Sequence, residues 1–135
     1  MKALDTNVLA RFFIDDPDDD QAARQRPASV AALSERAFVS ITVLLEFEWV
    51  MRGFYGLPPE EFARVVTALA GVGHVSIEDR GAVLAALDAR ARGMDFADAL
   101  HVIRGSRASG FATFDQRLAR RATALALSPT VELLT

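Results

Sequence analysis

The sequence predicts an α/β fold built around a central parallel sheet of four to five short strands. The first observation behind this prediction is that five short apolar segments with strand character occur along the chain. The second is that helical patterns separate these segments, which is typical of a parallel sheet with helices on both faces. The third is composition, because 135 residues of which 51% are hydrophobic can bury one core. We therefore expect residues 1–135 to form a single domain.

The chain opens with a short apolar run at residues 2–4, which we expect to be the first strand. Asp5, Thr6 and Asn7 follow, and these residue types favour a helix start before the apolar spacing of residues 8–13. The acidic run at residues 15–20 stops that helix and starts a second one. We prefer this interpretation to a calcium loop, because no Gly and distal Glu follow at EF-hand spacing.

The second helix is expected to extend to about residue 35, with a break or bend near Pro27. Further strands are expected at residues 37–40, 74–77, 111–114 and 130–134. Further helices are expected at residues 41–55, 58–71, 80–92, 95–103 and 116–124. The helix at residues 41–55 has more apolar surface than one side of a sheet covers, so we expect part of it to contact a protein partner.

Composition excludes several classes of protein. The chain has no cysteine and two histidines, so disulfides, thiolate zinc sites and cysteine nucleophiles are excluded. The net charge is −3, and it is uneven: residues 1–79 have seven basic and thirteen acidic side chains, whereas residues 80–135 have eight and five. Binding of nucleic acid by bulk positive charge is therefore not expected. With no apolar stretch of about 20 residues and no secretory signal, we expect a soluble cytoplasmic protein.

Four acidic residues are candidates for a shared site. Asp5 and Asp115 directly follow expected strands, where ligands bind in open α/β sheets, and Asp98 lies in the first turn of an expected helix. Glu46 lies within the apolar helix, where an unpaired carboxylate is costly. Each has a structural alternative: Asp5 and Asp115 could cap helices, as could Asp95 in place of a ligand role for Asp98. Glu46 could pair with a buried arginine, and periodicity alone does not separate it from Glu48.

A cluster of carboxylates has restricted chemistry. The groups repel one another, so without a cation at least one would be protonated. Ligands that offer only oxygen atoms suit Mg²⁺ or Mn²⁺, which lower the pKa of a bound water and stabilise the charge of an attacked phosphodiester.

Four motifs resemble, in order and over essentially the whole chain, those of PIN-domain ribonucleases and among them the VapC-type toxins of toxin–antitoxin pairs. They are Ala3-Leu4-Asp5-Thr6-Asn7-Val8-Leu9, Val43-Leu44-Leu45-Glu46-Phe47-Glu48-Trp49-Val50, Asp95-Phe96-Ala97-Asp98-Ala99-Leu100 and Thr113-Phe114-Asp115. The resemblance implies an α/β/α sandwich whose acidic residues bind divalent metal for endonucleolytic cleavage of RNA. It places Asp5, Glu46, Asp98 and Asp115 on the acidic positions of the family.

The same resemblance assigns supporting roles and partners. Thr6, Asn7 and Thr113 fall on polar positions that orient the acids. A homodimer and a small cognate antitoxin that silences the enzyme are implied, and Mg²⁺ or Mn²⁺ is the implied cofactor. We expect the arginines at positions 104, 107, 117, 120 and 121 either to hold flanking phosphates or to form a solvated helix face. We interpret His101 as an ordinary helix residue, and Trp49, Phe54 and Tyr55 as core or dimer contacts and not surfaces for base stacking.

Two alternatives stay open at this point. An aspartate-based phosphatase-like enzyme or receiver domain would use Asp5 as nucleophile or metal ligand. That chemistry needs a lysine downstream of the aspartate, and the one lysine of the chain, Lys2, lies upstream. The other alternative is a non-catalytic binding module of the same fold that sequesters a partner.

Overall fold

Five short strands, all paired in parallel, form two sheets in the computed structural model, which describes all residues from Met1 to Thr135. Strands β1 (Lys2–Ala3), β2 (Ala37–Val39) and β3 (Val75–Ile77) form the first sheet in that order. Strands β4 (Phe111–Thr113) and β5 (Val131–Leu133) form the second. The predicted α/β class with parallel strands is confirmed. The strands of the predicted parallel sheet form one hydrogen-bonded group of three and one of two.

The chain divides into two compact units, Met1–Arg80 and Gly81–Thr135, and each contains one of the sheets. Every strand agrees with its predicted range to within one residue at each end. No helix is both long enough and apolar enough to cross a membrane.

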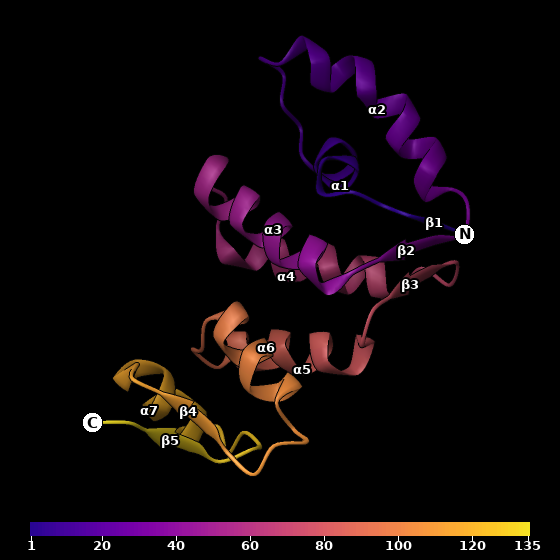
Figure 1. The fold of residues 1–135 in the computed structure, drawn as a ribbon. Helices are drawn as coiled ribbons and strands as arrows, with labels where there is room; N and C mark the ends of the chain where they lie inside the picture. The colour runs from indigo at the N-terminus through magenta and orange to yellow at the C-terminus, as the bar shows by residue number, and fades with distance from the viewer. The chain divides into compact units, whose positions relative to one another are not determined.

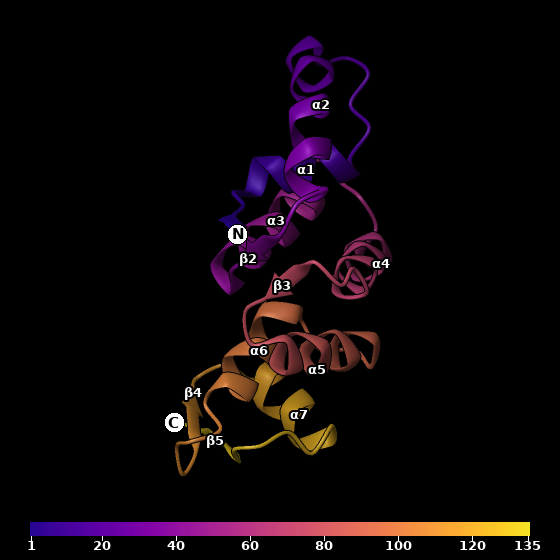
Figure 2. The same cartoon turned by 90° about the vertical axis from the view of Figure 1, so that its right-hand side faces the viewer.

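The first unit places helices between its strands, as a parallel sheet requires. They are α1 (Thr6–Phe13), α2 (Asp20–Leu33), α3 (Ile41–Trp49), the π-helix η1 (Val50–Phe54) and α4 (Pro59–Ala70). Helix α1 packs against both α2 and α3, and α4 contacts β3 (Figures 1 and 2). The predicted helix over residues 41–55 is therefore one helical run whose last turn is wider than the rest.

Helix α2 begins where its acids predict and continues where a break was expected. The Asp19 carboxylate accepts a hydrogen bond from the Gln21 N–H, which caps the helix. Pro27 lies inside the helix without interrupting it, so of the predicted break or bend the break is wrong. A proline removes one helical N–H, and the carbonyl left without that donor belongs to Ala23, which is exposed and can bond to water instead.

The core of the first unit is aliphatic and aromatic. Phe47 has no exposed surface, and its ring lies 6.4 Å from that of Phe13 and 6.2 Å from that of Phe62, measured between centroids. Leu9 and Leu44 are also fully buried. These contacts join α1, α3 and α4, so they hold the first turn of α1 and the exposed side of α3 in fixed positions.

The second unit is smaller and mainly helical. Its helices are α5 (Arg80–Ala91, whose first residue belongs to the first unit), α6 (Phe96–Arg104) and α7 (Gln116–Ala124). Helix α7 contacts α6 and both strands of the pair, which lie side by side in both views (Figures 1 and 2). Phe96, Leu100 and Val102 of α6 are buried, and Asp98 in its first turn is half-buried, whereas His101 is exposed.

Candidate functional site

A shallow pocket of about 250 Å³ lies in the first unit, where α1 begins and α3 passes into η1. It is lined by Asp5, Thr6, Asn7, Ala10, Arg11, Glu46, Val50, Phe54 and Tyr55. Two of the four predicted acids therefore share one pocket with both predicted polar residues of the first motif.

Asp5 is held at the start of α1 by one of its carboxylate oxygens. Its Oδ1 accepts a hydrogen bond of 2.8 Å from the Thr6 N–H, and its backbone is extended, as in a helix N-cap. Asp5 therefore caps α1, as the structural alternative predicted, and it does so through Oδ1 alone. Because Asp5 is exposed, its Oδ2 remains open to a ligand in the pocket.

The Thr6 side chain is 5% exposed, and its hydroxyl has no hydrogen-bond partner. A buried polar group without a partner costs free energy, and native structures rarely contain one unless water or a ligand satisfies it. Thr6 lines the same pocket as Asp5 and Glu46. One of the residues that line the pocket therefore carries a buried polar group without a partner.

Glu46 and Glu48 differ in what they contact. Glu48 binds Arg52 one turn along, with distances of 2.8 and 3.3 Å from its two oxygens to Nε and Nη2. Glu46 is exposed, has no ion pair and lines the pocket. The expected cost of a carboxylate in an apolar helix does not arise here, because Glu46 is on the side of α3 that faces water.

The π-helix brings aromatic residues to the same pocket. Phe54 is eight residues after Glu46, which in a regular α-helix would leave the two about 80° apart around the axis. In η1 the Tyr55 N–H bonds to the Val50 carbonyl five residues earlier, so each residue advances by a smaller angle. Phe54 consequently returns toward the side of the helix that carries Glu46, and both line the pocket.

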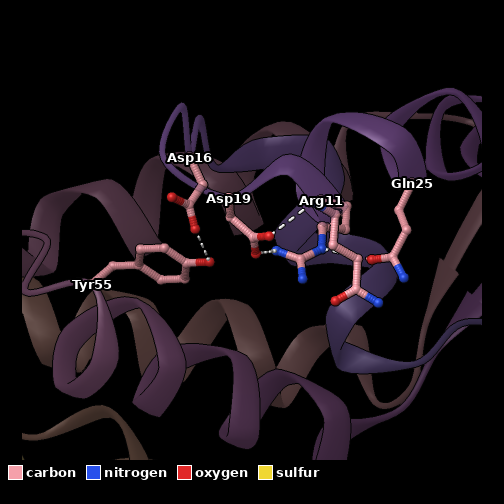
Figure 3. Close-up of polar contacts among 6 residues, drawn as sticks. Arg11, Asp16, Asp19, Gln25 and Tyr55 are labelled. Carbon is pink, nitrogen blue, oxygen red and sulfur yellow. Dashed lines mark hydrogen bonds and ion pairs between the residues drawn. The ribbon is translucent and has the colours of Figure 1, made fainter.

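The edge of the pocket is tied to the acidic loop after α1 (Figure 3). The Tyr55 hydroxyl donates to Asp16 at 3.0 Å, and burial together with this contact raises the Tyr55 pKa above its ordinary value. Arg11 donates to Gln25 at 2.8 Å and lies 3.4 Å from the Asp19 carboxylate. The acidic run thus has structural contacts with both Tyr55 and α1.

The second unit holds the other two predicted acids. Asp95 caps α6 by accepting a hydrogen bond of 3.0 Å from the backbone N–H of Asp98. The side chain of Asp98 takes no part in this cap and is half-buried. The Asp98 pKa is raised, first by burial and then by the negative charges of Asp95 and Asp115. His101 and Arg117 oppose that shift. The raised pKa means that this position favours the protonated, neutral form of the Asp98 carboxyl.

Asp115 caps α7, since its Oδ1 accepts a hydrogen bond of 3.0 Å from the Leu118 N–H. Its own N–H donates to the Thr113 hydroxyl, also at 3.0 Å. Thr113 therefore orients the backbone of Asp115, while the second carboxylate oxygen of this exposed residue stays open. No group of three or more histidine, aspartate or glutamate side chains in the structure is arranged to hold a metal ion.

The comparison with known families decides the fold assignment. The model of the family described as PIN domain matches residues 2–124, which is most of the chain and includes residues of both units. This chain belongs to the PIN domain family. PIN domains are generally nucleases and typically use divalent metals, so activity on nucleic acid is the chemistry expected here. A search of curated proteins finds none that matches the chain.

Sequence reasoning missed which aromatic residues of this PIN domain reach the acids. Trp49 and Phe54 are 56% and 72% exposed, so neither is a core residue, and the alternative expectation that they form dimer contacts stays a prediction. Of these two, Phe54 lines the pocket. No sequence signal marks a π turn, and without it helical spacing points Phe54 away from Glu46.

Proposed function

We propose that this PIN domain is a metal-dependent endoribonuclease toxin of the VapC type, neutralised by a cognate antitoxin. We propose further that residues 1–135 act as one domain, which the extent of the family match across both units supports. The observation that carries the enzymatic proposal is the first-unit pocket, where two carboxylates without ion pairs adjoin a buried, unpartnered hydroxyl.

The residues suit a divalent cation with oxygen ligands. Asp5, Glu46, Asp98 and Asp115 would supply the carboxylates, and this donor set suits Mg²⁺ or Mn²⁺. The unpartnered hydroxyl of Thr6, which lines the pocket with Asp5 and Glu46, supports a polar occupant of the first-unit pocket. When bound, such an ion activates water for attack on phosphorus and stabilises the developing negative charge.

The protein's own contribution is positioning. Asp5 is held by the Thr6 N–H through one oxygen, so the direction of the other oxygen is set by the start of α1. Asp115 is held in the same way at the start of α7 and is oriented from behind by Thr113. Carboxylates anchored through one oxygen lose little freedom when the other binds a ligand. The Thr6 hydroxyl would orient a water in the pocket.

Charge and exposed apolar surface support the proposed partners. Arg117, Arg120 and Arg121 of α7 line a hollow of about 390 Å³, and they could bind phosphates of an RNA substrate. Trp49 in the first unit and Phe114 in the second are large apolar side chains that are more than half exposed. Such positions suit a second copy of the chain or an antitoxin segment.

The test is cleavage by purified chain freed of bound protein. We expect it to cut RNA in Mg²⁺ or Mn²⁺ and to stop in EDTA, with DNA of the same sequence as a second substrate. Asp5→Asn should be inactive while folded. Glu48→Gln is the matched control, because Glu48 is paired with Arg52 and does not line the pocket. Cleavage that persists in chelator, or is lost equally in the Glu48 variant, would refute the proposal.

A native purification tests the partners. The proposed antitoxin should be recovered as a small protein bound to the chain, and the freed chain should be dimeric at micromolar concentration. A monomer that recovers no small protein, yet cleaves RNA, would remove the toxin–antitoxin part of the proposal and leave the nuclease part intact.

A further inference from the structure

We propose that Phe54, beside the first-unit pocket, is a stacking platform for a base of the substrate strand. The inference rests on the proposed nuclease function and adds a residue that binds the substrate. It concerns the nine residues that line the pocket at α1, α3 and η1.

The first step is the place of the Phe54 ring. The side chain is 72% exposed, although phenylalanine gains free energy from burial. It lines the pocket that contains Asp5 and Glu46, so a molecule that reaches the acids meets the ring as well. An aromatic face beside carboxylates suits a ligand that has both a flat π surface and a phosphate, as each nucleotide does.

The second step is that the neighbouring ring of Tyr55 supports the ring of Phe54. The Tyr55 ring meets the Phe54 ring edge to face, with centroids 4.9 Å apart and planes at 78°. Tyr55 is itself anchored, because its hydroxyl donates to Asp16 (Figure 3). A ring held before the ligand arrives loses less freedom on binding, which favours affinity.

The third step concerns the size and the unmet polarity of the pocket. Its volume, about 250 Å³, is below the roughly 300–1,000 Å³ of sites that enclose a whole small molecule. It suits one part of a longer ligand that continues outside. Thr6 also lines the pocket, and its buried hydroxyl has no hydrogen-bond partner within the protein.

A duplex does not offer Phe54 the same contact as a single strand. In a duplex each base is stacked between its neighbours, so its flat face is not open to a protein ring. An unpaired base can leave its neighbours and stack on an aromatic side chain, with little dependence on sequence. Stacking on Phe54 therefore requires an unpaired base, so comparing a single strand with a duplex tests the proposed contact.

The competing explanation is that Phe54 contacts a second copy of the chain. Trp49 serves as a matched control, since it is an exposed aromatic residue of the same helical run that does not line the pocket. A dimer contact predicts that Phe54→Ala changes the mass of the particle in solution. Base stacking predicts that it changes RNA binding at unchanged mass.

The experiment measures binding of a labelled, short RNA of randomised sequence to the full chain by fluorescence anisotropy in Mg²⁺. The background variant is Asp98→Asn, which is expected to prevent cleavage and lies in the other unit. On this background Phe54→Ala and Phe54→Leu should each weaken binding about tenfold, whereas Phe54→Trp should retain it. Trp49→Ala should bind as the background does, and an RNA duplex should bind more weakly than the single strand.

Several results would overturn the inference. They are unchanged binding by Phe54→Ala, full binding by Phe54→Leu, which has apolar surface but no ring, and equal binding of duplex and single strand. Weakened binding that coincides with loss of a dimer would assign Phe54 to the copy interface instead. Failure of the nuclease proposal is distinguishable, because it appears as absent cleavage by the chain without substitutions, whatever the binding series shows.

Discussion

The two units present their acidic residues in different ways. In the first, Asp5 and Glu46 line an open pocket together with a buried hydroxyl and an exposed ring. In the second, Asp98 is half-buried, and the charges of Asp95 and Asp115 help to raise its pKa. The first arrangement offers space and partners for a ligand, whereas the second concentrates negative charge.

This difference shows that acidic residues at similar positions in the sequence, at the starts of helices, can have different surroundings in the structure. Asp5, Asp95 and Asp115 all cap helices through one oxygen, so capping does not distinguish a ligand from a structural residue. What distinguishes them is what surrounds the other oxygen. The predictions that follow test whether the two regions serve one reaction and whether their acids differ as described.

The largest effect should come from removing one acid in each region. We expect Asp5→Asn and Asp98→Asn to lower RNA cleavage by more than about a hundredfold each, since even residues that only orient metal ligands cost about 10–100-fold. Cleavage rates at saturating Mg²⁺, with circular dichroism to confirm folding, check this. If only one of the two variants loses activity, the two regions do not serve one reaction.

The next effect is stabilisation by metal. Mn²⁺ at about a hundred times its Kd should raise the free energy of unfolding by about 2.7 kcal/mol. The gain should shrink as pH falls, because protons compete for the carboxylates. Thermal melts with and without Mn²⁺ test this in the unsubstituted chain and in Asp5→Asn. A gain that is independent of pH, or that survives in Asp5→Asn, would place the metal away from the first-unit pocket.

Substitutions at Asp95, which caps α6, should affect stability more than RNA cleavage. Asp95→Ala should lower the free energy of unfolding by about 1 kcal/mol while cleavage stays measurable, and Asp95→Asn should change little because asparagine caps equally well. Denaturant melts and cleavage assays on both variants make the comparison. If Asp95→Asn abolishes cleavage and Asp98→Asn does not, the functional acid is Asp95.

A smaller effect follows from the raised pKa of Asp98, whose ordinary value is 3.8. A carboxyl with a raised folded pKa binds its proton more tightly in the folded state, so stability falls as pH rises from the unfolded pKa through the folded one. Without metal, Asp98→Asn should therefore be more stable than the unsubstituted chain at neutral pH. The difference should vanish below pH 3.8, where both side chains are neutral. A stability loss at neutral pH would contradict the burial and repulsion at this position.

The smallest effect concerns the hydrogen bond between Asp16 and Tyr55, whose ring contacts that of Phe54. Tyr55 is the single tyrosine of the chain, so its ionisation is readable by ultraviolet absorbance. Its midpoint should lie above 10.0, chiefly because of burial and then because of the Asp16 contact. Asp16→Asn should bring the midpoint closer to 10.0, with Asp18→Asn as the control. An unchanged midpoint in Asp16→Asn would contradict the hydrogen bond that anchors Tyr55 beside Phe54.

Local sequence determined the elements and their starts. Short apolar segments separated by helical patterns predicted all five strands, and cap residues predicted the starts of α1, α6 and α7. Both signals are local, because periodicity and capping act over a few neighbouring residues. The resemblance selected Glu46 over Glu48, which helical periodicity had left undecided. The family match supports the motifs as a set, and the site roles of the four acids stay predictions.

Tertiary structure decided the rest. The pairing of β1 with β2, of β2 with β3 and of β4 with β5 joins segments that are distant in the sequence. The place of Phe54 depends on a π turn whose extra residue leaves no mark in the apolar pattern. Residue types therefore determined which groups could do chemistry. Long-range packing decided which of them share a pocket, because the energy of a contact belongs to a pair and not to either residue alone.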